Sequence, residues 1–305
     1  ISVLLNACRR NFNLQKDAEI SIEANPGTLD SEKVKIYREA GINRVSMGVQ
    51  TFNDDLLKSI GRIHKLEDVY ESYKLLRKEK FENINIDLIF GLPDQSLDDV
   101  LFSIKEAINL GVEHISHYGL IIEEGTQFYK LSKMGKLNLP NEDEERLMYH
   151  KATEYLLERG YNHYEISNYA RPGYESRHNS FYWTGVEYLG LGLGSSSLIM
   201  DHRFNNITDL NEYIKKLLGS NKAGVCTEAN TNKCNSTICD GKNTLLQDPL
   251  GLRENLIKLS LKDKMEEFIF LGLRMQKGIS KKEFADRFGR DIASVYADVI
   301  QKHIK

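Results

Sequence analysis

Short apolar segments and longer amphipathic segments alternate along the chain between residues 17 and 170. The short segments are rich in Ile and Val and stop at turn residues, which is typical of strands, whereas the longer ones repeat apolar residues at helical spacing. The expected strands are AEISIEA, RVSMGVQ, NINIDLIFG, HISHYGL and YNHYEISNYA. Because helical segments lie between them, the pattern predicts βαβ units and a parallel sheet.

One face of three successive expected strands is small and polar. Alternation places on that face Ser21, Glu23 and Asn25, then Ser46, Gly48 and Gln50, then Asn83, Asn85 and Asp87. A parallel strand covered by helices on both sides is apolar on both faces, and a packed α/β barrel is filled with aliphatic side chains. We therefore expect an open interior in which Glu23, Gln50 and Asp87 converge towards the C-terminal ends of their strands. The alternative is the solvent-facing side of an antiparallel sheet, which the helical spacers disfavour.

The sequence changes in character after Ala170. RPGYESRHNSFYW reads as a loop rich in hydrogen-bonding side chains, and YLGLGLGSSSL, with its alternating glycines, reads as a strand that approaches a ligand or another backbone closely. Residues 219–262 are polar and weakly periodic, which predicts an insertion or linker. We expect three parts: an α/β domain with its extension at residues 1–218, this insertion, and a helical domain at residues 263–305.

Charge and hydropathy exclude some classes of function. With 41 basic and 44 acidic residues, the net charge of -3 gives no electrostatic footprint for nucleic acid. The C-terminal helix pair SKKEFADRFGRD and IASVYADVIQKHIK could bind DNA, but its mixed charge favours a packing or partner role. No apolar run is long enough to span a membrane, and the amphipathic N-terminus lacks the features of a signal peptide. A cytoplasmic location is therefore expected.

The cysteines do not form a recognisable metal motif. Three of the four, Cys226, Cys234 and Cys239, lie in VCTEANTNKCNSTIC, and Cys8 stands alone. Their spacing matches neither a structural zinc site nor a compact iron–sulfur loop. We interpret the three as free thiols in a polar loop, with a labile metal site as the alternative.

Several motifs occur in the same order as in one known family. They are EANPGTLD, GINRVSMGVQTFND, GRIH, NINIDLIFGLPDQS, ISHYGLIIEEGT, YEISNYARPG, SRHNSFYW and EEFIFLGLRMQKGI. In these motifs the chain resembles the HemW heme chaperones, which are related to the oxygen-independent coproporphyrinogen III oxidases within the radical SAM enzymes. The resemblance covers nearly all of the chain except the segment with the three cysteines.

This resemblance implies a fold, cofactors and site residues. The implied fold is α/β, a partial (βα)6 radical SAM barrel that is incomplete at its N-terminal side, followed by a C-terminal helical, winged-helix-like domain. S-adenosylmethionine (SAM) would bind in the barrel beside a 4Fe-4S cluster, with heme as the cargo. The implied SAM contacts are Glu23, Gln50, Arg62 and Asp87, with Ile121 and Ser196 as further contacts.

The chemistry of these side chains suits SAM. A carboxylate can accept hydrogen bonds from ribose hydroxyls or from the methionyl ammonium group, and Gln50 can both donate and accept. Arg62 offers a planar, permanently charged fork for a carboxylate. Without the resemblance, a surface salt bridge would be the favoured interpretation of Arg62, since SIGRIHK lies in a connector, and the family motif reverses that preference.

The chain departs from the family in one respect. The family's cluster ligands form a CxxxCxxC motif after the first barrel strand, and this sequence contains no such motif. Its first expected strand corresponds to the third strand of the family, so we expect an incomplete sequence. We assign no catalytic residue and no metal ligand, and expect that this polypeptide neither holds the cluster nor cleaves SAM.

Three functions are compatible with these features. The first is a heme chaperone that delivers heme to an acceptor protein, with a transient membrane-protein partner as one option. The second is an oxygen-independent coproporphyrinogen III oxidase, and the third is a DNA-binding regulator. The motifs SRHNSFYW and EEFIFLGLRM favour the chaperone, for which His178 is a candidate heme contact because neutral imidazole binds iron well. A hydrogen-bonded loop histidine is the alternative for His178.

Overall fold

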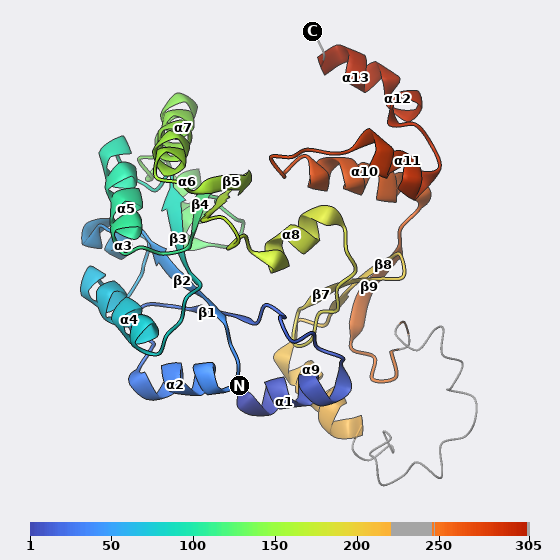
Figure 1. The fold of residues 1–305 in the computed structure, drawn as a ribbon, viewed down its shortest axis with the longest axis horizontal. Coiled ribbons are helices and arrows are strands. Elements are labelled where there is room, and N and C mark those ends of the chain that lie inside the picture. Colours follow the sequence, from blue (N-terminus) through green and yellow to red (C-terminus); the bar gives the residue numbers. More distant parts are fainter. Residues whose placement is uncertain (221–245, 247, 304–305) are drawn as a thin grey trace. The chain divides into compact units, whose positions relative to one another are not determined.

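The computed structural model describes residues 1–220, 246 and 248–303 (Figure 1). The chain divides into two compact units, residues 1–178 and 179–305. Cys226, Cys234 and Cys239 lie outside the described residues.

The first unit is built on a six-stranded sheet with the order β1-β2-β3-β4-β6-β5. Its strands are β1 (Ser21–Ala24), β2 (Arg44–Gln50), β3 (Ile84–Phe90), β4 (His114–Gly119), β5 (Asn162–Glu165) and β6 (Asn168–Ala170). Strands β1 to β4 pair in parallel, as the sequence predicts. The sheet is therefore open at β1 and β5, which is compatible with a partial barrel.

The last expected strand, YNHYEISNYA, is in fact a hairpin. It forms β5 and β6, which pair with each other antiparallel, and β6 also pairs antiparallel with β4. The turn is closed by Glu165, whose Oε1 accepts a hydrogen bond from the backbone N–H of Ser167 at 3.2 Å. This local bond lies at the turn formed by Ile166 and Ser167, within a segment that was expected to be a single strand.

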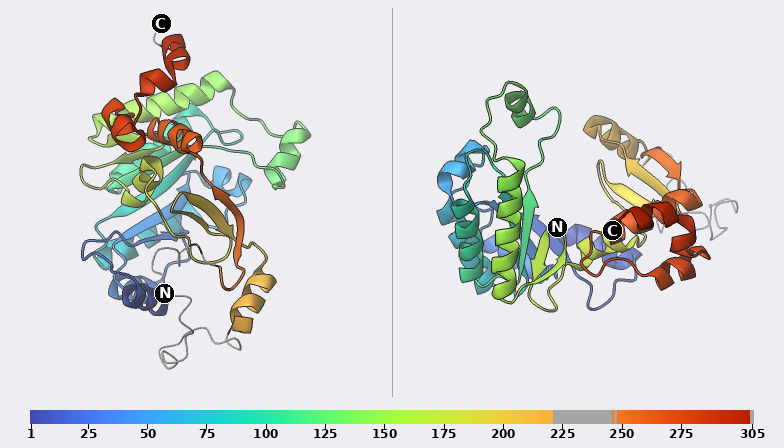
Figure 2. Two further views of the ribbon diagram at one scale, coloured as in Figure 1. Left: turned by 90° about the vertical axis from the view of Figure 1, so that its right-hand side faces the viewer. Right: turned by 90° about the horizontal axis from the view of Figure 1, so that it is seen from above.

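Helices α2, α4, α5 and α7 lie on one side of this sheet (Figures 1 and 2). The helices of the unit are α1 (Ser2–Asn11), α2 (Ser31–Glu39), α3 (Asp54–Ser59), α4 (Leu66–Lys78), α5 (Leu97–Asn109), α6 (Gln127–Lys133) and α7 (Glu142–Glu158). Asn53 caps α3 as expected, accepting from Asp55 N and Leu56 N. Gly41 and Gly111 follow α2 and α5 with φ of 88° and 70°, as left-handed C-cap positions require.

The hydrophobic core lies between these helices and the apolar face of the strands. It contains Val45, Met47, Ile84, Ile86 and Ile115 from the sheet, all fully buried. Burying this face against helices directs the alternate side chains of the same strands away from the helices. The packing of the core therefore sets the direction of the polar residues.

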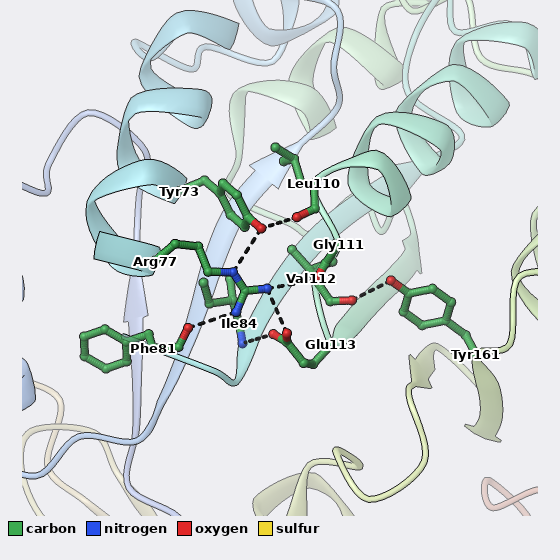
Figure 3. Close-up of polar contacts among 9 residues, drawn as sticks. All are labelled: Tyr73, Arg77, Phe81, Ile84, Leu110, Gly111, Val112, Glu113 and Tyr161. Atoms are coloured by element: carbon green, nitrogen blue, oxygen red, sulfur yellow. Dashed lines mark hydrogen bonds and ion pairs between the residues drawn. The ribbon is translucent and has the colours of Figure 1, made fainter. Parts of the chain in front are cut away.

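Hydrogen bonds to one guanidinium group tie the helices to the start of the parallel strands (Figure 3). Arg77 at the end of α4 donates to Glu113 Oε1 at 2.8 Å, to the carbonyls of Phe81 and Gly111, and to the hydroxyl of Tyr73. Glu113 in turn accepts from the backbone N–H of Ile84 at 3.0 Å. These bonds join α4, β3 and the segment that leads into β4, and so fix where the strands begin.

The second unit contains a three-stranded antiparallel sheet and a helical bundle. Its strands are β7 (Ser196–Ile199), β8 (His202–Asn206) and β9 (Arg253–Lys258), in the order β7-β8-β9. Its helices are α9 (Leu210–Ser220), α10 (Leu261–Gly272), α11 (Lys281–Phe288), α12 (Ile292–Val295) and α13 (Ala297–His303). Strand β9 falls within the expected insertion or linker at residues 219–262. Met265, Phe284 and Ile292 form the core of the bundle.

The segment RPGYESRHNSFYW was expected to be a loop, but residues Arg177–Thr184 form helix α8. The sequence HNSFYW spaces its aromatic residues closely and lacks a clear apolar stripe, so periodicity did not reveal the helix. Among the described residues, no helix is both long and apolar enough to cross a membrane.

Candidate functional site

The polar side chains of the parallel strands lie in register across the first unit. Glu23 on β1 is the partner of Ser46 on β2, Ser46 is the partner of Asn85 on β3, and Asn85 is the partner of His114 on β4. Residues in register on neighbouring parallel strands point to the same side of a sheet. The polar face predicted from alternation is therefore present, and it continues on to β4.

Asp87 lies on this face, one pleat beyond Asn85. Its Oδ1 accepts a hydrogen bond from Asn85 Nδ2 at 2.8 Å, and its Oδ2 accepts from Ser46 Oγ at 3.0 Å. Ser116 on β4 is its partner in register. Two fixed donors hold the carboxylate in one orientation, and each of its oxygens keeps a lone pair for a further donor.

Burial raises the pKa of Asp87 above its ordinary value. The hydrogen bonds from Asn85 and Ser46 and the charge of Arg44 act in the opposite direction, but they do not offset the loss of hydration. Asp87 is half-buried, whereas Arg44 is 5% exposed. A carboxylate that loses hydration on folding interacts strongly with any cation or donor that a ligand brings to it.

The side chains of Gln50 and Arg62 both lie near Asn25, which follows β1. Arg62 donates to Asn25 Oδ1 at 3.1 Å. A Cβ added to Gly48 would lie 2.9 Å from Gln50 Nε2 and 3.3 Å from that same Asn25 oxygen. The amide of Gln50 therefore occupies the space that a side chain at position 48 would fill.

The backbone of Gln50 is unusual and explains how its side chain reaches this position. Its φ is 71°, in the left-handed region that few non-glycine residues adopt, and the pairing of β2 with β3 shifts register between Met47 and Gln50. The irregularity ends the regular strand at Gln50 and directs its amide over Gly48. Such strain is characteristic of functional positions.

The candidate SAM contacts are therefore distributed as follows. Glu23, Gln50 and Asp87 lie on strands β1, β2 and β3, and Arg62 in the connector between α3 and α4 contacts Asn25. Glu23 is exposed, Arg62 and Asp87 are half-buried, and Gln50 is buried. Their common role in ligand binding stays a prediction.

The remaining candidates lie outside strands β1 to β4. Ile121 follows β4 and is 78% exposed. His178 is an exposed residue of α8, and its backbone N–H donates to Glu19 Oε1 at 3.2 Å. Ser196 begins β7 in the second unit, where its hydroxyl accepts from Asn205 Nδ2 at 2.6 Å. Their assignments as SAM or heme contacts stay predictions.

Two family models match the chain, the Radical SAM superfamily at residues 2–107 and the HemN C-terminal domain at residues 259–305. The protein named heme chaperone HemW from Bacillus subtilis is 38% identical over 93% of this chain and 67% of its own length. The protein of the same name from Lactococcus lactis is 36% identical over 99% of this chain and 71% of its own length.

The chain belongs to the HemW family of radical SAM proteins. It spans roughly two thirds of the length of these relatives. Among solved structures, the radical SAM enzyme coproporphyrinogen III oxidase (HemN) from Escherichia coli superposes with a TM-score of 0.76. That match covers 98% of this chain and 65% of the other at 21% identity, and it supports the α/β radical SAM fold.

Membership of the HemW family implies SAM and a 4Fe-4S cluster, and the described residues fit only the first. For SAM, the polar face offers two carboxylates, a guanidinium group and the amide of Gln50, which lies over Gly48. For the cluster, the described residues contain a single cysteine, Cys8, and no group of three metal-binding side chains.

Sequence reasoning overlooked several polar residues of this face. His114 and Ser116 flank the apolar Ile115 in HISHYG just as Ser46 and Gly48 flank Met47 in RVSMGVQ, so a similar signal was present in the fourth strand. Asn25 was placed on the polar face, but its contact with Arg62 crosses a long sequence separation that no local pattern reveals.

Proposed function

We propose that this protein binds heme and delivers it to acceptor proteins, with SAM held on the polar face of the first unit. The observation that carries the proposal is the similarity to proteins named heme chaperone HemW over nearly the whole of this chain. A location in the cytoplasm and a transient membrane-protein partner stay predictions from the sequence.

Glu23, Gln50, Arg62 and Asp87 would hold SAM. The guanidinium group of Arg62 would pair with the carboxylate of the methionyl moiety, because its planar fork matches that group. Glu23 and Asp87 would accept hydrogen bonds from the methionyl ammonium and the ribose hydroxyls. In radical SAM proteins bound SAM supplies a reactive sulfonium group, and these four residues would bind and orient it.

His178 is the proposed contact for heme iron. Its side chain is exposed, and a neutral imidazole is a good ligand for heme iron. The alternative function, oxidative decarboxylation of coproporphyrinogen III, has support from the fold shared with HemN and from the HemN C-terminal domain model, but one fold can host several reactions. We therefore favour the chaperone.

A heme titration tests this function. Adding heme to the protein should produce a saturable absorption band, and His178→Ala should weaken binding by about tenfold or more, since an axial ligand is removed. His150→Ala is the matched control, because His150 is likewise exposed but lies on α7. Heme bound to the wild-type protein should then pass to apomyoglobin.

The outcomes separate the two functions. Equal heme affinity in the His178→Ala and control variants would reject the assigned ligand. Absence of saturable heme binding would reject the chaperone function, and formation of protoporphyrinogen IX from coproporphyrinogen III would favour the oxidase.

A further inference from the structure

Asn85 lies beneath Asp87 at the centre of a set of buried hydrogen bonds. It is 1% exposed, and its Nδ2 donates both to Asp87 Oδ1 at 2.8 Å and to Ser46 Oγ at 2.6 Å. Its Oδ1 lies 2.6 Å from His114 Nδ1 and accepts from Ser116 Oγ at 3.1 Å. Apart from Asp87, none of these hydrogen-bond partners of Asn85 has been given a role in the proposed SAM site.

The ionised carboxylate fixes the orientation of the Asn85 amide. A carboxylate can only accept hydrogen bonds, so the Asn85 atom 2.8 Å from Asp87 Oδ1 must be the nitrogen. The flipped amide would bring two acceptor oxygens into contact. With the nitrogen directed to Asp87, the amide oxygen necessarily faces His114.

The tautomer of His114 follows from this orientation. Because the Asn85 oxygen is an acceptor, His114 Nδ1 must carry the proton. Burial, and to a lesser extent the charge of Arg44, hold the pKa of His114 well below its ordinary value, so the ring is neutral and has no second proton. Nε2 is then an acceptor, and Tyr164 must donate its hydroxyl proton to it across 2.8 Å.

The last group in this series is a backbone amide. The N–H of Ser176 donates to the Tyr164 hydroxyl oxygen at 3.2 Å. Every donor in the series from Ser176 through Tyr164, His114 and Asn85 thus points towards Asp87. Hydrogen bonds that all run in one direction polarise one another, which strengthens the last of them.

We propose that Asn85, His114 and Tyr164 are positioning residues that hold the Asp87 carboxylate in the orientation that binds SAM. This proposal rests on the SAM site proposed above. The three residues come from β3, β4 and β5, so the chain of donors connects the parallel strands to the β5–β6 hairpin. Bound SAM would occupy the free lone pairs of Asp87, and the donors beneath would prevent the carboxylate from rotating away from it.

His117 provides a matched comparison within the same strand. It is 1% exposed, but neither of its ring nitrogens has a hydrogen-bond partner among the described residues, and its ring lies against Phe90 on the apolar face. Replacing either histidine by leucine removes a buried imidazole from β4. Only the replacement at position 114 interrupts the chain of donors.

The first test is spectroscopic and needs no ligand. In protein labelled with ¹⁵N at histidine, the nitrogen shifts distinguish the Nδ1–H tautomer, the Nε2–H tautomer and the charged ring. We expect His114 to be the Nδ1–H tautomer. Tyr164→Phe should shift the Nε2 resonance, because it removes the donor to that nitrogen. An Nε2–H or charged His114 in the wild-type protein would refute the chain of donors.

The second test compares SAM affinity among variants by titration. His114→Leu should weaken binding by about threefold to tenfold, the size expected for the loss of one net hydrogen bond. His114→Asn places an amide N–H close to the position of Nδ1 and should restore affinity to within about twofold. His117→Leu should bind SAM as the wild type does, and Tyr164→Phe should have a smaller effect than His114→Leu.

Each outcome has a defined meaning. If His114→Leu binds SAM like the wild type, or if His114→Asn binds as weakly as His114→Leu, the positioning role is refuted. If His114→Leu does not fold, the tautomer of His114 in the wild type and the SAM affinity of Tyr164→Phe still test the positioning role. If the wild-type protein binds no SAM, the proposed SAM site is rejected and the positioning role with it, while the tautomer of His114 separately reports whether the donors are arranged as inferred.

Discussion

Replacing Asp87 by asparagine separates the stability of the first unit from its affinity for SAM. The substitution keeps the size of the side chain and one acceptor oxygen, and it removes the negative charge. In the wild type, Asn85 Nδ2 donates to Asp87 Oδ1 at 2.8 Å, and the remaining oxygen of the variant can accept this same hydrogen bond. The new amide nitrogen then faces the hydroxyl of Ser46, which can rotate away from it.

The expected loss in SAM binding follows from the lost charge. A hydrogen bond to a charged group contributes ~1.5–3 kcal/mol, about twice or more the contribution of a neutral one. Asp87→Asn should therefore raise the dissociation constant for SAM on the order of tenfold to a hundredfold. Asp98→Asn is the matched control, because Asp98 is an exposed carboxylate in the first turn of α5 and lies outside the polar face.

The expected change in stability depends on pH and has a definite sign. The pKa of Asp87 is raised in the folded state, chiefly by burial, so the folded state holds this proton more tightly than the unfolded state does. The stability that Asp87 contributes is therefore fully present below its pKa in the unfolded state. It is lost as the pH rises through its pKa in the folded state. Asparagine does not titrate. The stability of Asp87→Asn relative to wild type should therefore increase from pH 3 to pH 7.

Two measurements check this reasoning. Urea unfolding at pH 3 and pH 7 gives the difference in free energy of unfolding between the two proteins at each pH, and SAM titration at pH 7 gives the affinity. We expect the asparagine variant to gain relative stability at the higher pH while its SAM affinity falls. If the stability of the variant relative to wild type is the same or lower at pH 7, burial does not destabilise the charged form of Asp87. Unchanged SAM affinity would show that Asp87 is not a SAM contact.

Three further changes test the fold and the site. Arg77→Lys keeps a positive charge but loses about three hydrogen bonds, so the free energy of unfolding in urea should fall by about 2–3 kcal/mol. The control Arg146→Lys, at an exposed position, should change it by less than about 0.5 kcal/mol. Gly48→Ala would place a methyl group 2.9 Å from Gln50 Nε2, so SAM should bind several-fold more weakly, and unchanged affinity would show that this amide is not a SAM contact. Glu23→Gln should weaken SAM binding on the order of tenfold to a hundredfold without lowering the thermal midpoint, because Glu23 is exposed; equal affinity would exclude it.

The sequence by itself determined the elements of the first unit and the side of the sheet on which its polar residues lie. Alternation in RVSMGVQ and NINIDLIF placed Ser46, Asn85 and Asp87 on one face, and the structure has them there. Asn53 identified a helix start in the same way. These features depend on residues close together in the chain, so local periodicity and capping chemistry suffice to predict them.

Only the tertiary structure decided which of these polar groups contact one another. The pairing of β2 with β3 brings Ser46 to Asp87, and the antiparallel hairpin brings Tyr164 to His114, across 50 residues of sequence. The irregular end of β2, where Gln50 has a positive φ, has no signature in RVSMGVQ. Strand order, register and backbone irregularities result from packing of the whole core, because many pairings satisfy the same alternation, and only their joint packing selects the one that orients Asp87.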